Sequence, residues 1–186
     1  MMPSSHDITP EILPEFMIVL KKLLRSGNNV LIVSKPHIDC IKVICNQCAD
    51  HTSQIMFRFT IGSTKSLTLA FWEPYAPGFD ERLECLKHAF SKGFQTSVSC
   101  EPYLDAYVAR TYTACRPYIT DSFWVGKLRG FNTRVKLKNT NQQDIKRYVD
   151  TLKQAQSDSI VRVMYSLLKD EPFIRWKDSI RDVIKT

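Results

Sequence analysis

Apolar residues occur along the chain in two alternating patterns, short continuous runs and longer amphipathic stretches. Residues 9–26 carry apolar side chains at the spacing of a helix, and Gly27 is placed to end it. Residues 30–33 are continuously apolar and rich in β-branched side chains, which is typical of a strand buried on both faces. The same alternation predicts further helices over 36–50 and 80–91, and further strands over 54–61, 95–100 and 118–125.

Strands that alternate with helices at this spacing are expected to be parallel, with right-handed helical crossovers. Three or four such units are too few to close an eight-stranded barrel. Residues 141–184 predict two or three more helices, which Asp158 and Asp170 are placed to begin. We therefore expect an α/β fold, with a partial (βα) barrel of parallel strands over residues 1–133 and a basic helical extension over 134–186.

Polar residues follow the predicted strands, where parallel sheets carry their binding loops. Asp7 lies in a segment that reads as a strand-to-helix loop, although only Met1, Met2 and Pro3 precede that segment. We therefore expect the barrel to be incomplete at its N-terminus. Helix capping is the alternative role for Asp7.

The segment Phe71–Pro77 combines three aromatic residues with two prolines, which predicts a rigid, ordered loop. Loops of this kind are often functional, because they present side chains from a fixed backbone. A plug that closes the end of the barrel is the alternative role.

The composition, 44% hydrophobic and 24% charged residues, is that of a globular domain and excludes a wholly disordered chain. No apolar stretch reaches the ~18 residues of a transmembrane helix, so no membrane association is expected. The first residues lack the pattern of a secretory signal. The six cysteines are scattered, so we expect reduced thiols and a cytoplasmic location.

The formal net charge of +7 is concentrated near the C-terminus. Residues 134–186 carry 12 basic and 7 acidic side chains, against 14 and 12 in residues 1–133. The densest basic stretch runs from Arg134 to Lys138, and Lys146 and Arg147 follow it. A basic stripe can track the phosphates of nucleic acid, although a solvated helix face is the more common role of such charges.

Cys40, Cys45 and Cys48 have a C-x4-C-x2-C spacing similar to that of one class of iron–sulfur ferredoxin. The segment predicts a regular helix, on which these three positions point in different directions. Core burial is therefore the expected role, with an iron–sulfur site as the alternative. The four histidines show no metal-ligand spacing, and no phosphate-binding, dinucleotide-binding or serine-hydrolase motif occurs.

Several short motifs carry a resemblance to a known family. They are Phe57–Gly62, Phe71–Pro74, Asp80–Leu83, Gly93-Phe94 and Glu101-Pro102. In this order they resemble the radical S-adenosylmethionine superfamily, and most closely its spore photoproduct lyase-like branch, over about residues 4–130.

The resemblance implies a partial (βα)6 barrel in which a C-x3-C-x2-C loop holds a [4Fe–4S] cluster. The reduced cluster cleaves S-adenosylmethionine to a 5′-deoxyadenosyl radical, which abstracts hydrogen from the substrate. In the lyase branch this substrate is a damaged thymine pair in DNA.

The resemblance also implies roles for four residues. Asp7 corresponds to a loop near the cofactor's ribose, and Lys35 resembles a lysine that pairs with the methionine carboxylate. Thr60 resembles a hydroxyl that hydrogen-bonds the cofactor, and Arg82 matches a recurrent arginine of the family. A salt bridge between Arg82 and Glu73 that supports the neighbouring loop is the alternative role for Arg82.

The chain departs from the family at the cluster loop, because it contains no C-x3-C-x2-C motif. We therefore expect it to be inactive alone and to need a cluster-bearing N-terminal polypeptide. The alternative function is a non-catalytic remnant that binds nucleic acid or a partner through the basic C-terminal helices. An unpaired parallel strand at 30–33 or 54–61 would also favour self-association.

Overall fold

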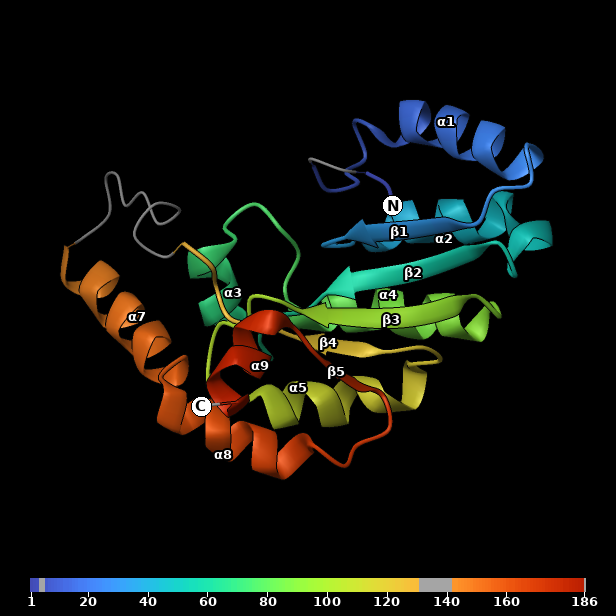
Figure 1. Cartoon of the computed structure of the whole chain (residues 1–186). Coiled ribbons are helices and arrows are strands. Elements are labelled where there is room, and N and C mark those ends of the chain that lie inside the picture. Colours follow the sequence, from blue (N-terminus) through green and yellow to red (C-terminus); the bar gives the residue numbers. More distant parts are fainter. Residues whose placement is uncertain (4–5, 131–141, 186) are drawn as a thin grey trace.

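A five-stranded sheet organises the computed structural model, which describes residues 1–3, 6–130 and 142–185 (Figure 1). All neighbouring strands are parallel and lie in chain order. They are β1 (Val30–Ser34), β2 (Ile55–Thr60), β3 (Gln95–Cys100), β4 (Phe123–Val125) and β5 (Ile174–Trp176). The predicted α/β fold with a parallel sheet, as in a partial (βα) barrel, is therefore confirmed.

Helices connect the strands and cover the sheet. Those before β4 are α1 (Leu13–Arg25), α2 (Ile38–Gln47), α3 (Ser66–Trp72), α4 (Phe79–Ser91) and α5 (Val108–Cys115). The C-terminal segment adds α7 (Gln142–Ala155), α8 (Asp158–Leu168) and α9 (Asp178–Lys185). In Figure 1 the arrowheads of β1, β2 and β3 point toward the side of the molecule where α3 and α7 lie. The carboxyl ends of these strands, and the loops that follow them, therefore meet on that side.

Apolar faces of the helices pack on the sheet to form one core. Leu20 of α1, Ile41 of α2 and Leu86 of α4 are fully buried, as are Ile32 and Phe57 of the strands. This burial removes the amphipathic stripes of the helices from water, which is the main source of their stability.

Strand β1 is only partly buried on its second face. Val30, Ile32 and Ser34 are buried, whereas Leu31 and Val33 are half-buried. The expectation of a strand buried on both faces is therefore wrong for β1. The physical reason is its position at the edge of an open sheet, where a strand has fewer neighbours to cover it.

The two edges of the described sheet are β1 and β5. β2 lies between β1 and β3, so the expectation of an unpaired strand at 54–61 is wrong. Met2 adds one parallel bridge to the outer side of β1, where its backbone N donates to Leu31 O at 2.8 Å and its O accepts from Val33 N at 3.0 Å. Most of that outer side is left without a strand partner among the described residues.

The C-terminal segment also contributes a strand, which the sequence did not predict. Ile174 pairs with Phe123, so β5 extends the sheet beyond β4. Asp158 begins α8 as predicted, but Asp170 lies in a turn and begins no helix. A strand of three residues is too short to show a hydrophobic period, because its existence depends on pairing with a distant neighbour.

Two further expectations need correction. Phe71 and Trp72 end the helix α3 rather than lying in a loop, and only the residues after them are irregular. The predicted strand over 118–125 is confined to β4, because a short helical turn runs up to Tyr118 and the backbone N of Thr120 and that of Asp121 share one acceptor, Thr96 O of β3, in place of regular strand pairing. No helix in the described ranges is long and apolar enough to cross a membrane.

Candidate functional site

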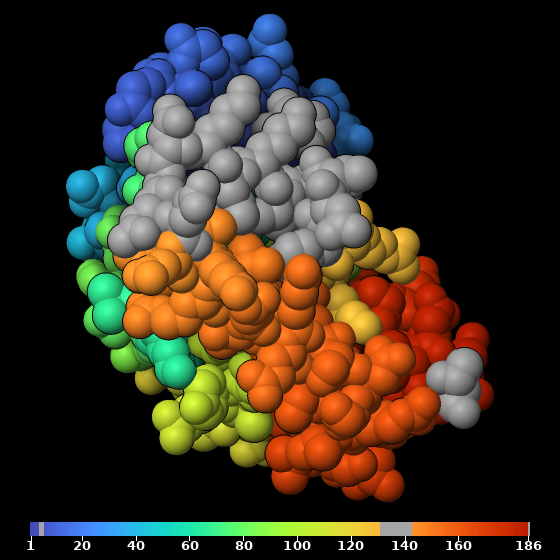
Figure 2. All heavy atoms as spheres, turned by 90° about the vertical axis from the view of Figure 1, so that its left-hand side faces the viewer, coloured from blue at the N-terminus to red at the C-terminus, as the bar shows by residue number. Residues whose placement is uncertain are grey.

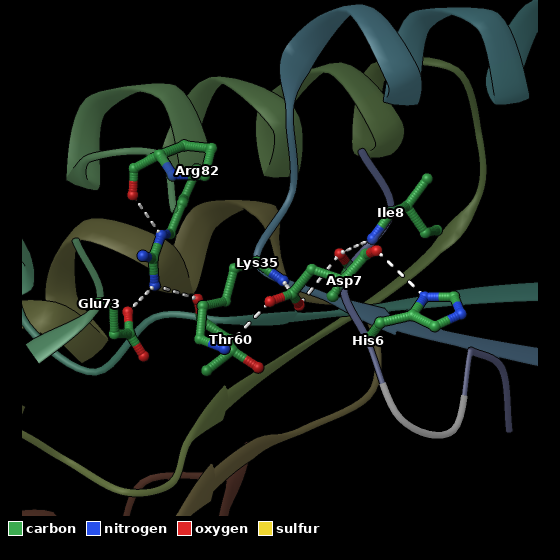
Figure 3. Close-up of polar contacts among 9 residues, drawn as sticks. His6, Asp7, Ile8, Lys35, Thr60, Glu73 and Arg82 are labelled. Carbon is green, nitrogen blue, oxygen red and sulfur yellow. Dashed lines mark hydrogen bonds and ion pairs between the residues drawn. The ribbon is translucent and has the colours of Figure 1, made fainter. Parts of the chain in front are cut away.

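The polar cluster around Asp7 lies at the carboxyl end of β1 (Figure 3). The Asp7 carboxylate accepts hydrogen bonds from Lys35 N at 2.7 Å, from Lys35 Nζ at 3.1 Å and from Ser34 Oγ at 3.3 Å. Ser34 Oγ in turn accepts a bond from Ile8 N at 2.9 Å. One carboxylate and one hydroxyl therefore tie the N-terminal segment to the end of β1.

Asp7 does not cap the helix that follows it. α1 begins at Leu13, and its N-cap residue, Ile12, makes no side-chain cap bond. The carboxylate is already occupied by donors from the end of β1, which is where tertiary folding places it. The capping alternative is therefore wrong, and Asp7 faces the sheet edge with Lys35.

A cavity of about 640 Å³ opens beside Asp7 and Lys35. This volume falls within the range of small-molecule sites, roughly 300–1,000 Å³. Other residues of its wall are His6, His37, Trp72, Glu73 and Tyr75. Trp72 and Tyr75 belong to the aromatic segment 71–77, so that segment does form part of a pocket.

Arg82 is fully buried and is used within the protein. Its Nε donates to Pro77 O at 2.7 Å and its Nη1 donates to Thr60 O at 3.0 Å. Nη1 also lies 2.7 Å from Glu73 Oε2, so the predicted salt bridge is present. Nη2 is buried and has no hydrogen-bond partner among the described residues. Arg82 therefore fastens both ends of the loop from Glu73 to Pro77 to the end of β2.

The four predicted site residues fall into two clusters (Figure 3). Asp7 and Lys35 lie together on the cavity wall, whereas Thr60 and Arg82 are not part of that wall. Thr60 contributes its backbone oxygen to Arg82, and its hydroxyl makes no hydrogen bond within the described ranges. The second cluster thus holds the loop that carries Glu73 into the cavity.

The thiols of this chain do not fit an iron–sulfur cluster. Cys40, Cys45 and Cys48 are each 1% exposed and belong to the core, as expected. Burial raises the pKa of all three, that of Cys45 to about 12, and so opposes the thiolate that iron requires. In the part of the chain that the structure describes, no group of three or more potential ligands is arranged to hold a metal ion.

Sequence reasoning did not single out His37 or Trp72 as individual site residues. Both line the cavity, His37 as the N-cap residue of α2 and Trp72 as the last residue of α3. The cluster of aromatic residues at 71–77 was the available signal for Trp72. For His37 the only available signal was weaker: this residue follows Lys35 by two positions in the sequence.

The comparisons with known proteins bear on the fold. No family model and no curated protein matches the sequence. Among solved structures, the crystal structure of SuiB from Streptococcus suis matches with a TM-score of 0.51 and 11% sequence identity. SuiB is a radical S-adenosylmethionine enzyme. The fold resembles part of such an enzyme. The match covers 88% of this chain and 35% of SuiB, so this chain spans about a third of the structure it matches.

The cavity residues suit a ligand that carries both a carboxylate and hydroxyl groups. The Lys35 ammonium has three N–H donors, of which Asp7 takes one. Two donors are therefore free to bind an anionic group beside the cavity. The Asp7 carboxylate has further lone pairs with which it can accept from a hydroxyl. S-adenosylmethionine has both kinds of group, so Asp7 and Lys35 fit this cofactor, whereas the cysteines do not fit its cluster.

Proposed function

We propose that this chain is part of a radical S-adenosylmethionine enzyme of the spore photoproduct lyase-like branch and supplies part of its cofactor site. The observation that carries the proposal is the joining of Asp7 and Lys35 on one cavity, at the carboxyl edge of a parallel sheet. The sequence motifs and the likeness to SuiB support it.

In this proposal Lys35 binds the methionine carboxylate with its free N–H donors, and Asp7 accepts a hydrogen bond from a ribose hydroxyl. Thr60 lies off the cavity wall and holds Arg82 through its backbone oxygen, and Arg82 acts as a positioning residue for the loop that carries Glu73. S-adenosylmethionine, when bound beside a reduced [4Fe–4S] cluster, supplies a carbon-centred radical. Because the thiols of this chain are buried in its core, a cluster-bearing N-terminal polypeptide supplies the ligands of the cluster.

Binding of S-adenosylmethionine to the purified chain tests the cofactor site. We expect isothermal titration calorimetry to detect binding that Lys35→Ala weakens about tenfold or more, because it removes a charged donor. The matched control is Lys42→Ala, which removes an exposed lysine 4.0 Å from Glu84 and outside the cavity. Equal affinities of the two variants, or no binding by the wild type at millimolar ligand, would contradict the proposed site.

Reconstitution tests the partner. Co-expression with a polypeptide that carries the cluster loop is expected to give reductive cleavage of S-adenosylmethionine, measured as 5′-deoxyadenosine. Continued inactivity of a cluster-loaded pair would count against the proposal. The open side of β1 is the edge at which self-association or such a partner would add a strand. Sedimentation of the chain alone as a stable monomer would exclude self-association but not the partner.

Nucleic-acid binding by the basic C-terminal helices is the second candidate. Lys146 and Arg147 are exposed on α7 and form no ion pair with any residue that the structure describes. Lys136 and Lys138 lie outside the described residues. Replacement of all four by Ala should weaken a salt-sensitive, sequence-independent affinity for DNA. An unchanged affinity would refute this candidate.

A further inference from the structure

A second cavity, of about 420 Å³, lies between the segments that follow β2 and β3 and the helix α7. Figure 2 shows these segments adjoining on one face, with α7 in orange, α3 in teal green and the residues near 105 in yellow-green. Trp72 lines both this cavity and the first one. The two cavities are thus neighbours that share one aromatic side chain.

Two cations without an ion-pair partner among the described residues, Lys65 and Arg147, line this second cavity, and Arg110 lies outside its wall against the ring of Tyr107. Lys65 Nζ lies 4.0 Å from the ring centroid of Tyr107, and the Arg110 guanidinium lies 4.8 Å from the same ring. The Arg147 guanidinium lies 5.3 Å from the ring of Tyr148. Within residues 6–130 and 142–185, no carboxylate pairs with any of these three cations. Each cation is therefore held over an aromatic face and is free to meet an anion.

The one acidic residue of the cavity wall does not neutralise this charge locally. Asp105 is 4% exposed, and its carboxylate accepts bonds from Ser63 Oγ and from Tyr107 N. Both of its oxygens are thus engaged in shaping the loop after β3. The polar groups that remain available to a ligand are the ammonium of Lys65 and the guanidinium of Arg147.

Three aromatic side chains, Trp72, Tyr107 and Tyr148, also belong to the wall. The ring of Tyr148 stacks on Phe71, with centroids 4.0 Å apart and planes 12° apart, so α7 is fixed against α3 at this point. Tyr107 is 40% exposed, and Trp72 lies on the wall beside it. Stacked and half-exposed rings next to cations are the features with which proteins bind nucleotides through both base and phosphate.

We propose that this cavity binds a nucleotide unit, with its phosphate between Lys65 and Arg147 and its base against Trp72 and Tyr107. The volume exceeds the minimum for a small-molecule pocket, roughly 300 Å³, and leaves room for a mononucleotide. The unit is either a free nucleotide or one residue of a single strand, since both present the same phosphate and base. The proposal does not depend on S-adenosylmethionine chemistry in the first cavity.

Calorimetric titration with 5′-AMP tests the proposal on the full chain. We expect Lys65→Ala and Arg147→Ala each to weaken AMP binding about tenfold or more. Adenosine lacks the phosphate and ribose 5-phosphate lacks the base, so each should bind at least about tenfold more weakly than AMP. The matched control is Lys87→Ala, whose ammonium lies 5.4 Å from the Tyr118 ring, away from the cavity, and which should bind AMP normally. Circular dichroism of each variant checks that it is folded.

Three results would overturn the proposal: no AMP binding at millimolar concentration, unchanged affinity in both variants, or full competition between AMP and S-adenosylmethionine. Competition would mean one shared site, whereas AMP binding that saturating S-adenosylmethionine leaves intact supports two. A single-stranded octanucleotide identifies the source of the unit. Binding more than tenfold tighter than AMP, with a salt dependence that Arg147→Ala reduces, supports a polymer, and equal affinity supports a free nucleotide.

Discussion

The buried ion pair between Arg82 and Glu73 predicts a large loss of stability on substitution. Arg82→Met keeps a long side chain of similar reach but removes the charge and all donors. The variant leaves the carboxylate of Glu73, only 12% exposed, without its cation. It also leaves Pro77 O and Thr60 O without the donors that bind them at 2.7 Å and 3.0 Å.

The expected cost follows from these contacts. Breaking a buried pair by removing one partner costs about 3–5 kcal/mol, because the other charge stays desolvated. The two carbonyl oxygens add to this cost only in part, since water can enter the vacated space. We expect Arg82→Met to lower the free energy of unfolding by about 3–5 kcal/mol. The control is Arg116→Met, which breaks the ion pair of Arg116 with Glu171. These side chains are 56% and 37% exposed, so the variant should lower the free energy of unfolding by only about 0–1 kcal/mol.

Urea unfolding followed by tryptophan fluorescence measures both variants, at unchanged m-value. Adding Glu73→Gln to Arg82→Met should recover at least about 1 kcal/mol, because the stranded charge is removed. A cost of Arg82→Met no larger than that of Arg116→Met would refute the reasoning. So would a double variant that is no more stable than the single one.

Three further predictions rest on other parts of the structure. All six cysteines are free and buried, and burial raises their pKa, so we expect a thiol reagent at pH 8 to label none in the native protein within minutes and all six in denaturant. Burial of His88, and to a smaller extent the positive charges of Lys92 and Lys42, lowers the pKa of this histidine in the folded state below 6.5. As pH falls, His88 therefore takes up a proton in the unfolded state before it does so in the folded state. Stability should therefore fall as pH falls below about 6.5, and His88→Gln should lessen this slope in urea titrations from pH 7 to 5. A Cβ at Gly62 would lie 2.7 Å from Pro102 O, so we expect Gly62→Ala to lower the free energy of unfolding by about 1–3 kcal/mol. A Cβ at Gly78 would meet only an atom 3.8 Å away, so Gly78→Ala is the control and should leave the stability nearly unchanged. Thermal melts measure both variants.

The strands with a clear hydrophobic pattern could be predicted from local sequence. β1, β2 and β3 occur within one or two residues of the predicted ranges. α5 and β5 were not predicted. β5 is three residues long and exists because Ile174 finds a partner in Phe123, about 50 positions earlier in the chain. Pairing over such a distance leaves no mark on local periodicity.

The sequence allowed some residues of the site to be predicted, but not how these residues are arranged around the cavity. Asp7 and Lys35 were expected at the strand edge, and the structure joins them at 3.1 Å. The sequence offered two roles for Arg82, and the structure shows its salt bridge with Glu73. Which residues face the cavity depends on how the loop after α3 folds back. That loop depends in turn on donors that Arg82 supplies from α4.

By itself the sequence determined the alternation of strands and helices, because apolar periodicity is a local property that follows from side-chain direction. It also determined that Cys40, Cys45 and Cys48 would be core residues, since their neighbours in the sequence are apolar. Only the tertiary structure decided the edge position of β1, the contact of Asp7 with the end of that strand and the sharing of Trp72 between two cavities. Each of these depends on residues far apart in the chain, whose approach is fixed by packing the whole sheet.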